Sequence, residues 1–339
     1  MHNNSNMAET RYRGRRATSI ENEHVRVTVL HEGGHIAEIL DKESGVNPLW
    51  TPPWESIEPS TYDPRKHPEY GADAESKLLG GIMGHNLCMD IFGPPSAEEA
   101  AAGLTVHGEA SVAAYEVTAA DGQLVERAYL PQAQLRVERL IRLAERALEI
   151  TENVTNEAIT DRPIAWTEHV TLGPPFLERG ATEFRAPVTK SLVLEEGNGD
   201  LELFTDAAAS GGFVTYLMDP SRETAFFVAW SPRSRVAFGY AWRRADFPWM
   251  GVWEENCSRK GAPWNGRTLT RGMEFGASPV AETRRQMVER GSLFGVPACR
   301  WIPARTRVEV RYHALIQGGL ERCPAELGPA AAGEVRFGH

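Results

Sequence analysis

Three residues far apart in the chain could together move protons. His169 ends a strand-like run that begins at Trp166, and a Gly-Pro-Pro turn follows at residues 173–175. His107 precedes a glycine, and Glu274 lies in a second short apolar run. A side chain at a strand end beside a loop is held rigidly next to a potential ligand, which is where catalytic groups usually lie. Imidazole and carboxylate groups can act as general acid and general base, so this set predicts proton-transfer chemistry.

A metal-binding signature occurs near the N-terminus, but its setting favours a turn. Residues 31–35, His-Glu-Gly-Gly-His, match the pattern H-E-x-x-H of zinc peptidases. That chemistry needs both histidines on one face of a helix. Two glycines would stand in the helix interior, each costing roughly 1 kcal/mol relative to alanine. The alternating Val25, Val27 and Val29 indicate a strand that leads into the motif, so we expect a tight turn.

The composition is that of a globular protein without a nucleic-acid or membrane partner. The 339 residues are 42% hydrophobic and 24% charged, which suffices for a large core. The net charge of −10 argues against nucleic acid, because phosphate binding needs a basic face. No apolar run approaches the roughly 18 residues of a membrane span, and the start of the chain lacks the apolar segment of a signal peptide. The 4 cysteines form no Cys-x-x-Cys pair, so a reducing cytoplasm is expected.

Short alternating segments predict an all-β protein. Residues 24–29 and 307–312 alternate apolar and polar side chains, and strand-like runs at 213–217 and 225–230 are bounded by Gly, Pro, Asp or Ser. The pattern favours one large antiparallel β-sandwich with few short helices. The expected organisation is a frayed tail over residues 1–18, the sandwich domain over 19–317 and a C-terminal extension over 318–339.

Two segments have residues that favour a helix. Residues 94–102 predict a short helix, with Ser96 as its cap and acidic residues in the first turn. Residues 135–150 contain good helix formers with an apolar stripe at helical spacing, but they also alternate as a strand would. Propensity favours a helix for this segment, whereas the alternation favours a strand.

Several short motifs occur in an order that resembles the galactose mutarotase-like (aldose 1-epimerase) family. Residues 80–94 contain a Gly-Gly-Ile step and a Phe-Gly step, and His107-Gly108 follows. With the later Val252-Trp253, this series is similar to the hexose-6-phosphate mutarotase branch. The resemblance covers about residues 19–317, and it implies a mutarotase-type β-sandwich in which residues 135–150 form two long strands.

The resemblance implies a cofactor-independent aldose 1-epimerase that interconverts the anomers of a small-molecule sugar. A base removes the proton of the anomeric hydroxyl while an acid protonates the ring oxygen; the ring opens and recloses on the other face. By resemblance, Glu274 is the base, His169 is the acid and His107 hydrogen-bonds the region of the ring oxygen. No metal is expected. The expected substrate-binding residues are His85, Trp253 and Asp246.

This assignment has geometric and chemical consequences. Glu274 and His169 should flank one sugar ring, some 5–8 Å apart, since hydrogen bonds to the ring require contacts of about 2.6–3.2 Å. Leu79 and Ser111 stand where the hexose-6-phosphate branch has arginines, so phosphorylated sugars are expected to be poorer ligands than neutral ones.

Two other functions remain open at this point. The first is a carbohydrate-binding protein on the same fold that does not catalyse, because a fold does not dictate a function. The second is a metal-dependent sugar isomerase or lyase with a mixed nitrogen and oxygen shell. The candidate ligands for that shell are His85, His107, His169 and Glu274.

Overall fold

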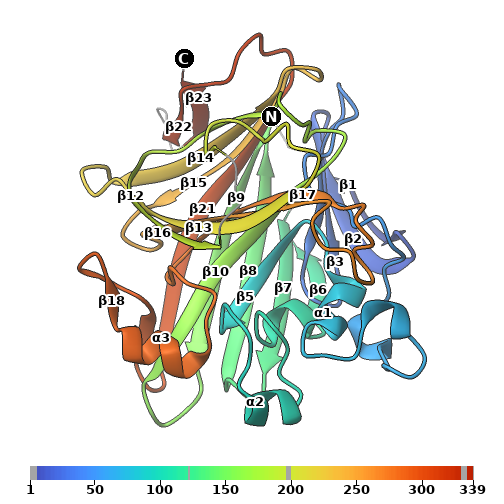
Figure 1. Ribbon diagram of the computed structural model, residues 1–339. Coiled ribbons are helices and arrows are strands. Elements are labelled where there is room, and N and C mark those ends of the chain that lie inside the picture. The colour runs from blue at the N-terminus through green and yellow to red at the C-terminus, as the bar shows by residue number, and fades with distance from the viewer. Residues whose placement is uncertain (1–5, 121–122, 196–199, 330–333, 339) are drawn as a thin grey trace.

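The computed structural model describes residues 6–120, 123–195, 200–329 and 334–338. Within these ranges the chain forms two large antiparallel sheets that share one hydrophobic core, with short helices at their edges (Figure 1). Alternating side chains from the two facing sheets fill that core, as in other sandwiches. The architecture confirms the predicted all-β sandwich.

The first sheet has eleven strands among the described residues and carries the candidate site. β20 (Arg300–Ile302) pairs with β10 beside the main path. The hydrogen-bonded order of the main path is β1 (Asn6–Tyr12), β2 (Arg15–Glu21), β3 (Val25–Leu30), β4 (Ile36–Asp41), β5 (His85–Asp90), β10 (Arg162–Leu172), β17 (Leu269–Gly276), β16 (Trp249–Asn256), β13 (Ser210–Met218) and β12 (Val188–Glu195).

The second sheet has eight strands among the described residues, and the ambiguous segment over residues 135–150 forms strands in it. Every second residue of β8 is buried, so the chain uses the period of two and not the helical stripe. A turn at Glu145, with φ of 51°, leads into β9. The predicted pair of strands is therefore confirmed. The order of the sheet is β11 (Glu183–Arg185), β14 (Thr224–Ser231), β15 (Val236–Arg243), β21 (Arg307–Gln317), β9 (Ala147–Asn156), β8 (Leu135–Ala144), β7 (Gln123–Leu130) and β6 (Glu116–Ala120).

The remaining elements are short. The helix predicted over residues 94–102 is confirmed as α2, which Ser96 caps by accepting a hydrogen bond from the Glu99 backbone N–H. None of the helices in the described part of the chain is long and apolar enough to cross a membrane. The short elements are α1 (Ser76–Gly81), α2 (Ala97–Ala101), α3 (Arg284–Arg290), the 3-10 turns η1 (Pro59–Thr61), η2 (Pro68–Tyr70) and η3 (Ala110–Val112), and the hairpins β18 (Ser292–Leu293) with β19 (Val296–Pro297) and β22 (Glu326–Pro329) with β23 (Val335–Gly338).

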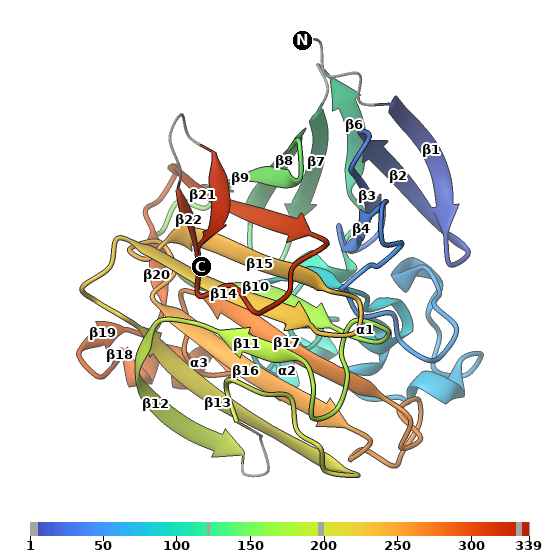
Figure 2. The ribbon, with the colours of Figure 1, turned by 90° about the horizontal axis from the view of Figure 1, so that it is seen from above.

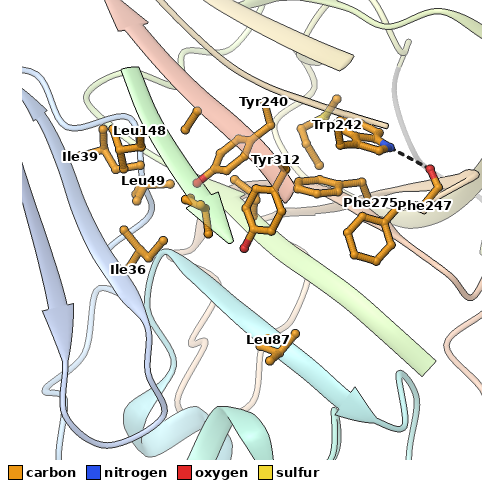
Figure 3. Close-up of a cluster of buried hydrophobic side chains, with 14 of the residues drawn as sticks. Ile36, Ile39, Leu49, Leu87, Leu148, Tyr240, Trp242, Phe247, Phe275 and Tyr312 are labelled. Carbon is orange, nitrogen blue, oxygen red and sulfur yellow. Dashed lines mark hydrogen bonds between the residues drawn. The ribbon is translucent and has the colours of Figure 1, made fainter. Parts of the chain in front are cut away.

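Large aromatic side chains fill the space between the sheets (Figure 3). Trp242 of β15 stacks on Phe275 of β17 with ring centroids 4.2 Å apart. The Trp242 indole N–H donates to the Phe247 backbone carbonyl at 2.8 Å, so its polar atom is satisfied in the core. Because Phe275 follows Glu274 directly, this packing fixes the strand that carries the candidate base.

The structure corrects the expected tail and clarifies the C-terminal extension. Residues 6–12 and 15–21 pair as β1 and β2, so the prediction of a frayed tail is wrong for residues 6–18, and residues 1–5 lie outside the described ranges. The C-terminal hairpin lies beside β14 (Figure 2). There Leu327 and Phe337 pack in a small apolar cluster on the second sheet. The extension is thus an integrated part of the sandwich.

Residues 31–35 form the predicted turn between β3 and β4. Gly33 and Gly34 have φ of +83° and +58°, values that glycine adopts without strain. The His35 ring nitrogen Nε2 contacts the Ser111 backbone carbonyl at 2.9 Å in the protein interior. The motif therefore has the backbone of a turn, and the helix that a zinc peptidase needs does not form here.

Candidate active site

His169 and Glu274 lie directly opposite each other on neighbouring strands. They are Cα partners in the register of β10 with β17, so both side chains point to the same face of the first sheet. His169 Nε2 lies 3.1 Å from Glu274 Oε1. The predicted separation of some 5–8 Å is therefore wrong. A cross-strand pair has its Cβ atoms only about 5 Å apart, which lets the two side chains meet directly.

Two glycines leave room for the Glu274 side chain. A Cβ on Gly272, two residues earlier on β17, would lie 2.4 Å from Glu274 Oε1. A Cβ on Gly251, the Cα partner of Glu274 on β16, would lie 3.5 Å from Oε2. A larger residue at position 272 would displace the Glu274 carboxyl group from this place. The sheet surface is thus hollowed around this one acidic side chain.

Burial favours the uncharged form of both members of the pair. Desolvation raises the pKa of Glu274 well above its usual value. Desolvation also lowers the pKa of His169 well below its usual value, with a further contribution from the neighbouring His107. These shifts favour a pair in which Glu274 keeps its proton and the His169 imidazole is neutral. Moving one proton across the 3.1 Å contact would convert it into a carboxylate and an imidazolium without changing the total charge.

His107 joins this pair from a loop. Its ring centroid lies 4.8 Å from that of His169, and its backbone adopts a left-handed φ of 67°. Nδ1 donates to the Phe92 backbone carbonyl at 2.6 Å, which fixes the tautomer. Desolvation is the main cause that lowers the pKa of His107 to about 4. A neutral His107 with its proton on Nδ1 can only accept a hydrogen bond at Nε2. Its expected contact must therefore be to a hydroxyl group and not to the ring oxygen.

Asn86 is a site residue that the sequence interpretation missed. It is the partner of His169 on β5, and its Nδ2 lies 3.4 Å from His169 Nδ1. Asn86 Oδ1 is buried and accepts no hydrogen bond from the described residues. Turning the amide would let Oδ1 accept a hydrogen bond from His169 Nδ1–H, which leaves Nε2 free to accept a hydrogen bond from the Glu274 carboxyl. Asn86 is thus placed to choose the tautomer of His169.

His107, His169 and Glu274 line a pocket of about 160 Å³. Trp253, a predicted substrate-binding residue, lines it, with its ring centroid 6.1 Å from that of His169. Glu75 and Trp264 also line it and were not predicted, and Arg259 lines it as well. The Arg259 guanidinium lies 4.7 Å from the Trp264 ring centroid and donates to Glu75 at 3.2 Å. These residues come from irregular loops whose path the sequence pattern does not reveal.

Two predicted substrate-binding residues do not reach this pocket. His85 precedes Asn86 on β5, so it points to the opposite face of the sheet. There it contacts Glu168 at 2.8 Å and Tyr240 at 2.9 Å in the protein core. Asp246 accepts two hydrogen bonds from Arg243, which hold the turn after β15. Both assignments are corrected: these side chains stabilise the fold away from the pocket.

The same alternation separates the four ligands of the suggested metal shell. His85 lies on the core face of the first sheet, whereas His107, His169 and Glu274 lie at the pocket. One ion could not contact all four. Among the described residues, the group of three whose ligand atoms lie within 4.8 Å of one another is Glu23, His24 and Glu145, on the surface.

Comparison with known proteins places the chain in a family and a fold. It belongs to the family described as Domain of unknown function (DUF4432), which matches residues 12–294. No curated protein sequence matches it. Its structure is similar to that of a candidate aldose 1-epimerase from Klebsiella pneumoniae, with a TM-score of 0.69 and 14% identity, covering 93% of this chain and 83% of that chain.

Two further solved structures agree with this result. A galactose mutarotase-like protein from Clostridium acetobutylicum gives a TM-score of 0.62 at 12% identity, covering 93% of this chain and 99% of that one. A galactose mutarotase related enzyme from Lactobacillus acidophilus gives 0.60 at 12% identity, covering 91% and 99%. At these identities the likeness shows the fold alone. The galactose mutarotase-like fold implied by the sequence motifs is therefore confirmed.

Proposed function

We propose that the protein is a cofactor-independent aldose 1-epimerase that interconverts the anomers of a monosaccharide. The observation that carries the proposal is the direct contact of His169 with Glu274, both buried, in the lining of a pocket of about 160 Å³. That volume suits one small ring and is below the roughly 300–1,000 Å³ of larger ligand sites. The galactose mutarotase-like fold supports the same reading.

The chemistry fits two groups in contact. The anomeric hydroxyl oxygen O1 and the ring oxygen O5 are bonded to the same carbon, C1. A base and an acid that lie side by side can therefore reach both atoms, and they need not stand on opposite sides of the ring. His169 and Glu274, 3.1 Å apart, meet this requirement.

Ring opening begins once the pair is in its charged form. The Glu274 carboxylate takes the proton from O1, and the electrons of the O1–H bond form the C1–O1 double bond. The C1–O5 bond breaks, and its electrons take the proton from the His169 imidazolium at O5. Rotation about C1–C2 then turns the other face of the aldehyde toward O5. Reclosure reverses both proton transfers, which returns the enzyme to its starting state.

His107 and Trp253 orient the sugar in this scheme. His107 Nε2 accepts a hydrogen bond from a hydroxyl of the sugar, because its Nδ1 proton already goes to the Phe92 carbonyl. Trp253 offers an apolar ring surface to the sugar's carbon–hydrogen face, 6.1 Å from the His169 ring. Both contacts hold C1 against the pair.

The deciding experiment is anomer exchange measured by NMR or optical rotation, starting from pure anomers of a panel of neutral and acidic aldoses. We expect acceleration by the wild type that Glu274→Gln abolishes and that the surface control Glu43→Gln leaves intact. No acceleration across the panel would contradict the proposal. Calorimetric binding of a sugar without exchange would instead favour a carbohydrate-binding protein.

Phosphorylated sugars are expected to be poorer substrates than neutral ones. Leu79, which stands where the hexose-6-phosphate branch has an arginine, lines the pocket. Arg259 is the one cationic side chain among the described lining residues, and Glu75 already binds it. Comparing glucose with glucose 6-phosphate at two salt concentrations tests this expectation. A salt-sensitive preference for the phosphate would contradict it.

A further inference from the structure

The polar side chains that line the pocket form a buried group and a group open to solvent. His169 and Glu274 are buried, with side chains 5% and 2% exposed, and the His107 ring centroid lies 4.8 Å from that of His169. The other charged lining residues are open to solvent: Arg259 is 40% exposed, Glu75 is 33% exposed, and Glu195 is exposed as well. The remaining lining side chains are apolar and form the side walls.

The side walls combine residues from distant parts of the chain. Leu78 and Leu79 come from α1, Phe213 comes from β13, and Ile82, Val106 and Trp264 come from loops. Leu78, Leu79, Ile82 and Trp264 belong to one buried apolar cluster. Among the described lining residues there is no Asn, Gln, Ser, Thr or Tyr. Apart from two indole N–H groups, the walls offer no side-chain partner to a hydroxyl.

The geometry of a pyranose relates these zones to particular atoms. C1 and O5 form one edge of the ring, and this edge must contact the acid–base pair. C3 and C4 form the opposite edge, so their hydroxyls point toward the exposed charged groups at the mouth. The substituents on C2 and C5 flank the reacting edge on its two sides. In this orientation the hydroxyl on C2, next to C1, is the one that donates to His107 Nε2, whose Nδ1 is already engaged with the Phe92 carbonyl. The exocyclic carbon C6, attached at C5 on the other side, then packs against the apolar side walls.

We propose that the substrate is a 6-deoxyhexose, a pyranose that carries a methyl group where an ordinary aldohexose carries a hydroxymethyl group. This inference rests on the proposed function, because it places C1 and O5 at His169 and Glu274. A methyl group packs against Leu79, Ile82 and Val106 without loss. A hydroxyl there loses its water and gains no partner, which disfavours the fully hydroxylated sugar.

The test compares matched pairs that differ only at C6. These are D-glucose with 6-deoxy-D-glucose, D-galactose with 6-deoxy-D-galactose, and L-mannose with 6-deoxy-L-mannose. We expect kcat/KM for anomer exchange to favour the deoxy member of the accepted pair by about 10- to 100-fold, the discrimination that an apolar pocket achieves against an added hydroxyl. Equal or higher values for the hydroxylated member in every accepted pair would overturn the proposal.

The two proposals fail in different ways. If no sugar is exchanged, the proposed function fails, and the inference is then decided by tryptophan fluorescence titration, since Trp253 and Trp264 line the pocket. Tighter binding of a 6-deoxy sugar than of its hydroxylated partner would support the inference. Equal binding, or no binding of either, would overturn it.

Variants of the wall provide an independent check. Val106→Thr keeps the side-chain shape and adds one hydroxyl, and Leu79→Asn adds an amide. Each should reduce the preference for the deoxy sugar toward equality, whereas Leu203→Asn, at a residue 40% exposed and outside the pocket lining, should not. Circular dichroism establishes that the variants fold. An unchanged preference in folded Val106→Thr and Leu79→Asn would contradict the role of the wall.

Discussion

The two faces of β10 carry the same residue types for different purposes. Glu168 and His169 are consecutive, so Glu168 points into the core between the sheets and His169 points into the pocket. Each meets a partner of the complementary type: Glu168 contacts His85 at 2.8 Å, and His169 contacts Glu274 at 3.1 Å. Both pairs are buried. The two pairs differ in the charged groups around them and in their access to a ligand.

The core pair belongs to a network around one cation. Arg139 Nε donates to Glu152 at 2.6 Å, and its other nitrogens lie 3.6 Å from Glu168 and 3.5 Å from Glu126. The Tyr312 hydroxyl lies 2.9 Å from Glu152 Oε1 and 3.0 Å from Glu168 Oε2, so its one proton serves both carboxyl groups. A buried arrangement of this kind tolerates its charges because most of them have partners.

Among the described residues, no Arg or Lys side chain forms an ion pair with the pocket pair, and both of its members line the pocket. His169 and Glu274 contact each other at 3.1 Å, and desolvation favours the uncharged form of both. A pair without a compensating charge keeps its proton mobile, whereas the network around Arg139 holds its charges in place. Burial of histidine with glutamate therefore does not by itself indicate catalysis; the neighbouring charges and the access to a ligand decide.

The largest expected effect is on catalytic activity, and it distinguishes the pocket pair from the core pair. Glu274→Gln should lower kcat for anomer exchange by about 10²- to 10⁴-fold, the usual contribution of one acid–base group. Its free energy of unfolding, measured in urea, should equal or exceed that of the wild type, because a costly buried acid is removed. Retained activity with a large loss of stability would mean that Glu274 stabilises the fold and does not take part in catalysis.

Removal of the core cation should act on stability. Arg139→Met leaves three buried carboxyl groups without a compensating charge and should lower the free energy of unfolding by about 3–5 kcal/mol. The control Arg142→Met, at a side chain on the same strand that is 64% exposed, should change it by less than about 0.5 kcal/mol. Equal urea midpoints for the two variants would show that the network does not stabilise the fold.

The core network should also make stability depend on pH. Desolvation is the main cause that raises the pKa of Glu126 to about 7, from 4.5 for an exposed glutamate. Because the pKa of Glu126 is raised in the folded state, its protonated form favours folding. This contribution to stability is complete below pH 4.5 and is lost as the pH rises through 7. The wild type should therefore lose up to about 3 kcal/mol relative to Glu126→Gln between pH 5 and pH 8. Parallel pH curves for the unfolding of the two proteins would contradict this expectation.

The smallest effect tests the link between Asn86 and His169. Asn86→Leu removes a hydrogen bond worth about 0.5–1.5 kcal/mol and should lower kcat roughly 2- to 10-fold. Asn86→Asp retains an oxygen that accepts from Nδ1 and raises the pKa of His169. It should restore kcat and shift the acid limb of the pH profile to higher pH. If Asp behaves like Leu, the amide acts as a donor to Nδ1 instead.

The sequence predicted the strands and the central pair, but not how they meet. Alternation and scattered turn residues were enough for the sandwich, and the family's motif order pointed to His169, His107 and Glu274. Their distance depended on the register of β10 with β17, which is set by contacts between residues about a hundred positions apart. The segment over residues 135–150 shows the same limit, since sheet packing overrode its helix propensity.

The errors at His85 and Asn86 have one cause. A strand alternates between two faces, and the sequence of β5 does not show which face lies toward the pocket, because all its side chains are buried. Choosing His85 selected the core face; the neighbour Asn86 reaches the site. Trp264 was missed for a different reason. It lies in a loop, where no periodicity relates sequence position to direction.

The position of β21 has a consequence for how the protein is made. This strand is near the C-terminus, outside the matched residues 12–294, yet it lies between β15 and β9 in the second sheet. During synthesis, His169 and Glu274 leave the ribosome before β21 can join β15 to β9 in the second sheet. The nascent chain must therefore hold two unpaired strand edges until residue 317 has emerged. The second sheet can therefore close only after β21 is available to pair with both β15 and β9.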